Sequence, residues 1–305
     1  MSRVSFQGVV AGFVESVLSR LEALGHQQTE LSSLWSFVCE DRADEQSFAL
    51  RHLEALMGFD PESCPESILS EALTLQKDMG VGAMSELAPV FGQRDQGQGL
   101  GELAWLASAI GIRGCPQVSK ADFVRGAGET IPWRQGVDAA RQLRLILSNR
   151  AEPLSDQKLL DLLGIGSGQW ASWGAEQKLP VAVAKPSRHG YFDFVPRKRH
   201  PLTKRFEIAR FLGDLLCESS EPEGWRVTSD LATARQKRQR AFAAEFLCPI
   251  DSLVDFLSGD YSEPALEEAG EYFGVSEKTV ESLLANNGYL GNSVIDQQVP
   301  YRLAV

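Results

Sequence analysis

The chain has few of the side chains that build metal centres and disulfide frameworks. Its 305 residues include only four His and five Cys, and no two Cys form a CxxC pattern. A scattered, odd number of cysteines is typical of reduced thiols in a cytoplasm rather than of a disulfide framework or a zinc cluster. The sequence also lacks an apolar run long enough to span a bilayer, and its start lacks the apolar core of a signal peptide. We therefore expect a cytoplasmic protein with no membrane partner.

Positive charge is also scarce. The chain has 30 Lys and Arg against 41 Asp and Glu, a net charge of −11. Residues 1–130 hold nine Lys or Arg and eighteen Asp or Glu, so about −9 of this charge lies in that region. A net negative charge repels polyanions at long range, which argues against broad, non-specific DNA binding. The hydrophobic content of 43% is that of a soluble globular protein rather than a disordered one.

Apolar spacing predicts a mostly helical α+β protein. Residues 9–24, 44–57 and 65–75 have the helical period, as do residues 136–147 and 157–163. The strand signals are two short runs at 179–184 and 191–195, which a hairpin loop at 185–190 separates. We expect an N-terminal helical region over residues 1–130, a second domain over residues 131–290 and a C-terminal tail over residues 291–305.

Residues 204–216 have the frame of a metallopeptidase helix without its reactive side chains. In a zincin, the motif HExxH places two His one helical turn apart on a Zn²⁺ ion, and its Glu activates the metal-bound water. Here Arg210 stands at the first His, Phe211 at the Glu and Asp214 at the second His. A guanidinium cannot ligate a cation and a phenyl ring cannot take a proton. We therefore expect this helix to form without the zinc ligands and the general base of a zincin.

A second block, residues 235–249, completes a resemblance to the ImmA/IrrE family of bacterial metallopeptidase-like proteins. The family's second signature is a helix that starts with a Glu ligand, followed by Ala-Asn and by Phe-Ala-x-x-Leu-Leu-x-Pro. Phe-Ala-Ala-Glu-Phe-Leu-Cys-Pro matches its second half, whereas Gln236 takes the ligand position. Residues 269–284 resemble the family's closing helix-turn-helix segment. The resemblance covers roughly the second half of the chain.

The resemblance implies a fold and a class of function. It implies a degenerate zincin-like domain, in which a small sheet packs against the motif helix and the second signature helix faces it. The family cleaves or controls regulators, typically repressors, in stress response, mobile-element control and phage defence. Because all three ligands and the general base are substituted, we expect a non-catalytic regulatory protein with a protein partner and with neither metal nor cofactor. The alternative is an active zinc-dependent endopeptidase with non-standard ligands.

The altered positions allow more than one arrangement. Arg210 and Asp214 are four residues apart, so on a helix their side chains share a face. A salt bridge between them could supply part of the cross-link of a metal, or Arg210 could engage Gln236 or Glu207 instead. A buried ion pair would need further hydrogen bonds to offset its desolvation. An ordinary amphipathic helix is the simpler alternative.

Two basic clusters flank the altered motif and suggest an anion-binding rim. The residues of this predicted rim are Lys198, Arg199, Lys204, Arg205, Arg235, Lys237, Arg238 and Arg240. If the two helices pack as in the family, the clusters converge on the former active-site cleft and could hold nucleic acid, a nucleotide or an acidic protein segment. The alternative is a solvated basic face. Sequence-specific DNA binding by the closing helices is not favoured, because the second of them carries Glu277 and Glu281 where a DNA-binding helix needs Arg, Lys, Asn or Gln.

Overall fold

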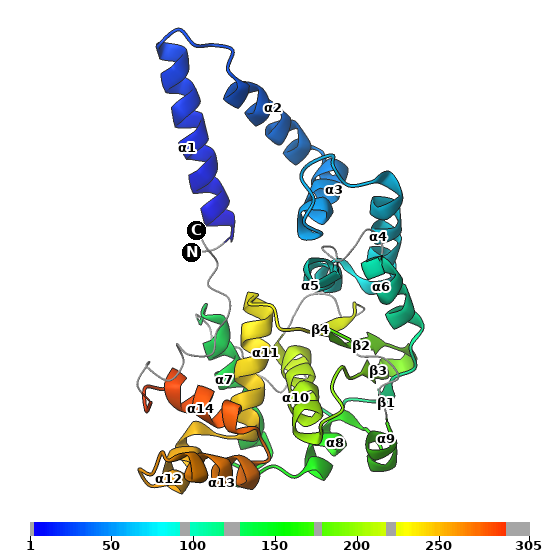
Figure 1. Ribbon diagram of the computed structural model, residues 1–305, viewed down its shortest axis with the longest axis vertical. Coiled ribbons are helices and arrows are strands. Elements are labelled where there is room, and N and C mark those ends of the chain that lie inside the picture. Colours follow the sequence, from blue (N-terminus) through cyan, green and yellow to red (C-terminus); the bar gives the residue numbers. More distant parts are fainter. Residues whose placement is uncertain (1–2, 92–97, 119–128, 174–178, 218–223, 291–305) are drawn as a thin grey trace. The chain divides into compact units, whose positions relative to one another are not determined.

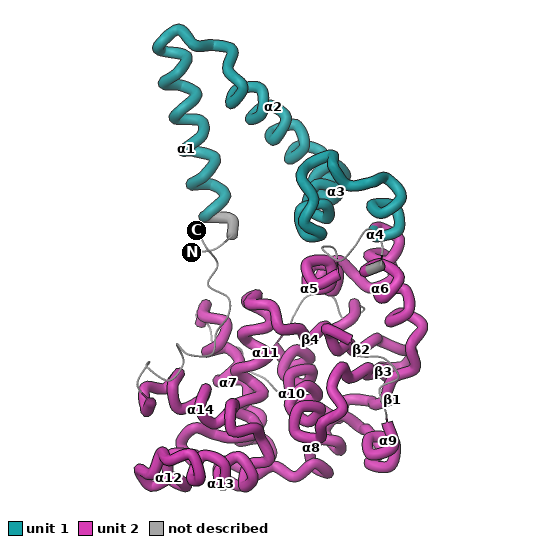
Figure 2. The backbone as a smooth tube through the Cα atoms, in the orientation of Figure 1, with its two compact units in different colours: residues 1–72 teal, residues 73–305 magenta. Residues whose placement is uncertain are grey.

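The computed structural model describes residues 3–91, 98–118, 129–173, 179–217 and 224–290 (Figure 1). The predicted C-terminal tail, residues 291–305, lies outside the described residues. The chain divides into two compact units, residues 1–72 and residues 73–305 (Figure 2). This boundary does not coincide with the domain boundary that the sequence suggested at residue 130.

The described part of the first unit is helical. It contains α1 (Arg3–Ala23), α2 (Glu30–Ala43), α3 (Glu45–Leu56) and the start of α4 (Glu66–Met79). Helix α1 covers the helix predicted over residues 9–24, and α3 covers most of the one predicted over 44–57. Helix α2 was not predicted, although Thr29 and Ser32 form a reciprocal capping box at its start. Asp44 ends α2 and caps α3 by accepting a hydrogen bond from the Ser47 amide at 2.7 Å.

The second unit contains one small sheet, the end of α4 and the remaining helices. Its helices are α5 (Val81–Phe91), α6 (Gln98–Ser108), α7 (Pro132–Ile146), α8 (Asp156–Leu163), α9 (Ser167–Ser172), α10 (Pro201–Cys217), α11 (Ala234–Leu247), α12 (Ile250–Leu257), α13 (Glu263–Phe273) and α14 (Glu277–Asn286). Its strands are β1 (Ile112–Gly114), β2 (Ala182–Pro186), β3 (Phe192–Val195) and β4 (Arg226–Thr228). The mostly helical α+β class expected from the sequence is confirmed for the described residues.

The sheet is antiparallel, with the strand order β1-β3-β2-β4. The predicted hairpin is present as β2 and β3, whereas β1 and β4 are too short to give a strand signal. Phe192 and Phe194 are two residues apart on β3, so both side chains lie on the same face of the sheet. On that face their rings contact the ring of Phe211 of α10, at centroid distances of 4.6 and 5.8 Å. Helix α10 therefore packs on the small sheet, as the motif order required. Strand β1 belongs to this sheet although it precedes residue 130.

Helix α11 lies between α7 and α10 and approaches both closely (Figure 1). A glycine stands at each crossing. A Cβ atom on Gly136 of α7 would lie 2.3 Å from the Arg238 carbonyl oxygen, and one on Gly213 of α10 would lie 2.5 Å from the Phe242 ring. These glycines bring the three backbones close enough for Phe242 to be fully buried.

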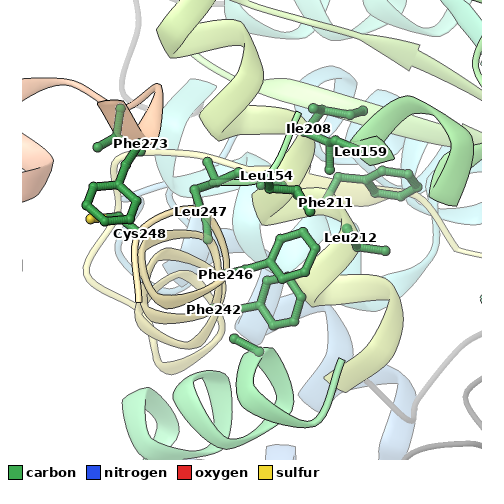
Figure 3. Packing of buried hydrophobic residues seen from close by; sticks show 14 of the residues in the cluster. Leu154, Leu159, Ile208, Phe211, Leu212, Phe242, Phe246, Leu247, Cys248 and Phe273 are labelled. Carbon is green, nitrogen blue, oxygen red and sulfur yellow. The ribbon is translucent and has the colours of Figure 1, made fainter. Parts of the chain in front are cut away.

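The main hydrophobic core forms around these helices. In Figure 3 the rings of Phe242 and Phe246 lie together beside Leu212 of α10, and the two ring centroids are 5.3 Å apart. The core continues through Cys248 to Phe273 of α13, so the closing helices share it. Helices α13 and α14 are joined at Gly274, which has a left-handed φ of 64°. None of the described helices is both long and apolar enough to cross a membrane.

The close crossing predicts that Gly213→Ala destabilises the protein although alanine favours helices. The added methyl group meets a buried ring that has no space to move, so the free energy of unfolding should fall by about 1–3 kcal/mol. Gly101→Ala in α6 is the matched control, because its Cβ would meet nothing within 4 Å. The control should be neutral or stabilised by up to about 1 kcal/mol. Urea denaturation of both variants measures the difference, and equal shifts would contradict the packing argument.

Candidate functional site

The three positions that the resemblance would assign to metal ligands lie together between α10 and α11. Arg210 and Asp214 lie one turn apart on α10, and Gln236 lies in the first turn of α11. Arg210 Nη2 donates to Gln236 Oε1 at 2.5 Å and to the Ser229 carbonyl oxygen at 2.7 Å. The contact between Arg210 and Gln236 was one of the alternatives left open by the sequence. Another of those alternatives, an ion pair between Arg210 and Asp214, is not found among the described residues, where Asp214 pairs with Arg226 and Arg235.

Asp214 pairs with two other arginines. Arg235 of α11 donates to its two carboxylate oxygens at 2.8 and 2.6 Å, and Arg226 of β4 donates at 3.0 Å. Burial alone would raise the pKa of Asp214. Hydrogen bonding and charge from Arg235, the charge of Arg226 and a hydrogen bond with Gln239 outweigh that effect and lower the pKa to about 2. This fully buried carboxylate is therefore ionised at neutral pH and already has two cationic partners.

Gln236 connects Arg210 to a carboxylate that sequence analysis did not identify. Its Oε1 accepts from Arg210 and from the Ser229 amide, at 2.5 and 2.9 Å. Its Nε2 donates to Glu86 at 3.0 Å and to the Val227 carbonyl oxygen at 3.0 Å. An amide has two donors and can accept twice, so these four bonds use its full capacity.

Glu86 extends from α5 to the start of α11. It also accepts a hydrogen bond from the Thr233 hydroxyl at 2.8 Å, and Thr233 in turn caps α11 by accepting from the Gln236 amide at 3.2 Å. Helix α5 belongs to the region that the sequence assigned to a separate N-terminal part. Neither its apolar pattern nor a motif around Glu86 indicates this contact.

Arg210 is a buried cation held by neutral acceptors. Its side chain is 2% exposed, and its Nε is buried without a partner among the described residues. Burial lowers the pKa of Arg210 to about 9, and the nearby positive charges of Arg240 and Arg197 add to the effect. The group remains protonated at neutral pH. Its position depends on the packing around it, because no carboxylate bonds to it directly.

A second group of ion pairs, formed by Arg197, Glu207 and Asp230, lies near the end of β3. Arg197, after β3, donates to Glu207 of α10 and to both carboxylate oxygens of Asp230, at 2.8 and 2.7 Å in the latter case. Burial raises the pKa of Glu207, and Arg197 opposes that rise. The charge of Arg197 is therefore paired within the chain, with Glu207 and Asp230.

Phe211, at the position that the resemblance would assign to a catalytic Glu, packs on the sheet. Its ring packs against Phe192 and Phe194 of the sheet and is 2% exposed. Phe211 therefore belongs to the hydrophobic core between α10 and the sheet, and its ring has no group that can take a proton.

The side chains at this site do not suit a metal. A guanidinium occupies one of the three positions, Gln236 Oε1 already accepts from Arg210 and from the Ser229 amide, and both carboxylate oxygens of Asp214 are bonded to arginine. Within the described ranges, no group of three or more His, Cys, Asp or Glu side chains is placed to hold a metal ion.

The predicted basic rim does not converge. Lys204 and Arg205 lie in the first turns of α10, about 15 and 14 Å along the helix axis from Asp214, where Arg235 binds. Lys204 donates to the Trp170 carbonyl oxygen at 2.6 Å, and Arg205 donates to Asp156 at 2.5 Å. The two clusters thus contact different parts of α10, because the two helices pack antiparallel.

Most of the other rim residues also have partners within the chain. Arg238 donates to Gln135 at 3.3 Å, and Arg240 donates to the Leu231 carbonyl oxygen at 3.0 Å. Lys198 is half-buried, whereas Arg199 and Lys237 are exposed. The rim offers fewer exposed cations for an anionic partner than the sequence suggested.

The structure predicts that Asp214→Asn is strongly destabilising. The substitution leaves Arg226 and Arg235 partly or fully buried without their shared carboxylate, which should lower the free energy of unfolding by about 3–5 kcal/mol. Asp193→Asn is the matched control, because it removes a carboxylate from an exposed pair with Arg113. That pair should contribute at most about 1 kcal/mol. If chemical denaturation gave both variants the same loss in free energy of unfolding, the buried network would stabilise the protein no more than the exposed pair does.

Comparison of the chain with protein-family models, with curated proteins and with solved structures finds no match. A relationship to the ImmA/IrrE family therefore depends on the motif residues and on the geometry described above. That geometry consists of a small sheet, a motif helix packed on it, and a second helix that brings Gln236 to Arg210.

Proposed function

We propose that the protein is a non-catalytic regulatory or interaction protein built on a metallopeptidase-like scaffold, a degenerate relative of the ImmA/IrrE family. Its expected setting is bacterial stress response, mobile-element control or phage defence. The observation that carries the proposal is the meeting of Arg210, Asp214 and Gln236 between two helices, with hydrogen bonds and ion pairs in the place of a metal.

The chemistry of the site supports the loss of catalysis. A guanidinium at Arg210 cross-links α10, α11 and the segment after β4, which is a structural task that a metal ion also performs. It cannot polarise a carbonyl by coordination or activate a bound water, as a catalytic Zn²⁺ does. Phe211 supplies no base. The zinc-dependent endopeptidase with non-standard ligands is therefore the weaker alternative.

Exposed apolar side chains support a protein partner. Helix α2 has no buried residue, and its Leu34 and Phe37 are 61% and 66% exposed. On α1, Phe13 is 69% exposed. Adjacent large apolar groups on a soluble surface are typical of interaction sites. Residues 1–72 carry four Arg against twelve Asp and Glu, so a partner with basic side chains around an apolar centre fits this unit best.

The closing helices give little support to a DNA-binding role. Residues 249–290 contain nine Asp and Glu and a single Lys. A helix-turn-helix that binds DNA needs positive charge to neutralise phosphates. The helix-turn-helix prediction therefore concerns only the shape of α13 and α14, and nucleic-acid binding through the predicted rim has few exposed cations to support it.

Metal analysis tests the non-catalytic proposal. Wild-type protein purified in the presence of zinc should contain no stoichiometric Zn²⁺ and should cleave no peptide. The double variant Arg210→His with Gln236→Glu keeps Asp214 and so offers three ligands of the kinds that zinc accepts, and it should bind about one Zn²⁺ per chain. The single variant Arg210→His is the control and should bind more weakly.

Two results would contradict this account. Stoichiometric zinc in the wild type, with peptidase activity lost on chelation, would favour the active endopeptidase. A double variant that keeps its helical circular dichroism but gains no zinc would mean that the three positions do not have the geometry of a former metal site.

Paired surface variants test the interaction part of the proposal. Leu34→Ser with Phe37→Ser should abolish capture of the partner from a lysate of the source cells without changing thermal stability. Leu145→Ser with Ile146→Ser removes two apolar residues of comparable exposure, 47% and 51%, from α7 and should leave capture unchanged. Identical capture by all three proteins would remove the support that α2 gives to the proposal.

A further inference from the structure

An open cleft lies beside the β2–β3 hairpin, near the sheet edge formed by β1. It has a volume of about 380 Å³ and is lined by Arg113, Ser187, Arg188, His189 and Tyr191. Strand β4, which supplies Arg226 to the network around Asp214, is the opposite edge of the sheet. The cleft shares no residue with that network, so its function does not depend on the one proposed above.

The hairpin loop holds its side chains in a defined and uncommon backbone conformation. The loop is closed by a hydrogen bond from the Ser187 amide to the Tyr191 carbonyl oxygen at 2.7 Å. His189 has a φ of 60° and Gly190 a φ of 78°, so two consecutive residues adopt the left-handed region. A residue with a Cβ rarely adopts this conformation, and such positions gather at ligand sites. His189 and Arg188 are both exposed and both line the cleft.

Arg113 reaches the cleft from β1. Its Nε and Nη2 donate to Asp193 at 3.2 and 3.4 Å, and Nη2 also donates to the Ser187 hydroxyl at 3.3 Å. These contacts orient the guanidinium and leave Nη1 without a partner among the described residues. The side chain is 57% exposed, and its guanidinium carbon lies 6.0 Å from the centre of the Tyr191 ring. A planar donor and an aromatic face therefore lie side by side.

We propose that this cleft binds a mononucleotide, with the phosphate between Arg113 and Arg188 and the base against Tyr191. Arginine donors match the oxygens of a phosphate, and the hydroxyl of Ser187 and the imidazole of His189 add polar partners. A half-exposed tyrosine ring next to a cation is a surface on which a base stacks.

The size and charge of the molecule favour a small ligand over a polymer. Ligand pockets commonly span about 300–1,000 Å³, so this cleft suits a compact molecule. The net charge of −11 repels a long polyanion but has less effect on a small one at physiological salt, because screening limits the repulsion to within about 8 Å of each charge.

Calorimetric titration of the full chain with adenosine monophosphate tests the proposal. Binding should weaken about tenfold in Arg188→Ala and in Arg113→Gln, which corresponds to the loss of one charge-assisted contact. Tyr191→Ala should weaken binding of the nucleotide but leave binding of inorganic phosphate unchanged. Arg150→Ala, which removes the same charge from the loop after α7, is the control and should bind like the wild type. Thermal melting of each variant verifies that the fold is kept.

Several outcomes would overturn the proposal. Binding of adenosine as tight as that of adenosine monophosphate would show that no phosphate site exists. Absence of nucleotide binding at low salt, or equal binding by the wild type and by Arg188→Ala and Arg113→Gln, would show that the cleft is only a solvated surface. Binding of a short single-stranded oligonucleotide without any binding of the mononucleotide would point to nucleic acid instead.

Discussion

The burial of charge between α10 and α11 is the constraint on which the rest of this unit depends. Arg210 is enclosed with neutral acceptors, and Asp214 is enclosed between two arginines. Buried charges are tolerated only where their partners are held in place, so the helices that carry these partners must keep their spacing. Gly136 and Gly213 allow that spacing, because a side chain at either position would separate α11 from its neighbours. The buried hydrogen bonds and ion pairs at this crossing therefore depend on the close helix packing that the two glycines permit.

A metal ion, or a network of arginine, glutamine and aspartate, can hold two helices at this spacing. Both tie two helices and a strand end together through a cation. The two cations differ in their chemistry. A catalytic zinc ion keeps an open coordination position for water or substrate. A guanidinium only donates hydrogen bonds, and here it donates them to the protein. A buried arginine without a carboxylate partner also has a desolvation cost, which its pKa of about 9 reflects. In this chain the side chains of Arg210, Asp214 and Gln236 connect α10, α11 and β4 through hydrogen bonds and ion pairs.

The sequence predicted the elements that have strong local signals. The helices over residues 204–216 and 235–249 were expected from the family resemblance, and the hairpin of β2 and β3 from its two short strand signals. Gln236 was one of the alternative partners considered for Arg210 and Asp214. Glu86 and Arg226 were not predicted, because they reach the site from a helix and a three-residue strand that have no motif of their own. The rim was predicted from two basic clusters and from the helix packing that the family resemblance implies. Charge does not reveal that a cation such as Arg205 is already bound inside the fold, since only the packing decides which acceptors it meets.

Anomalous diffraction from crystals grown with excess zinc tests the central claim most directly. The account predicts no zinc peak between α10 and α11, and density that places the Arg210 guanidinium against the Gln236 amide oxygen and the Ser229 carbonyl oxygen. A zinc peak within coordination distance of Asp214, with the Arg210 side chain displaced from that space, would contradict it. In that case the positions described as a hydrogen-bonded cross-link would be a working metal site.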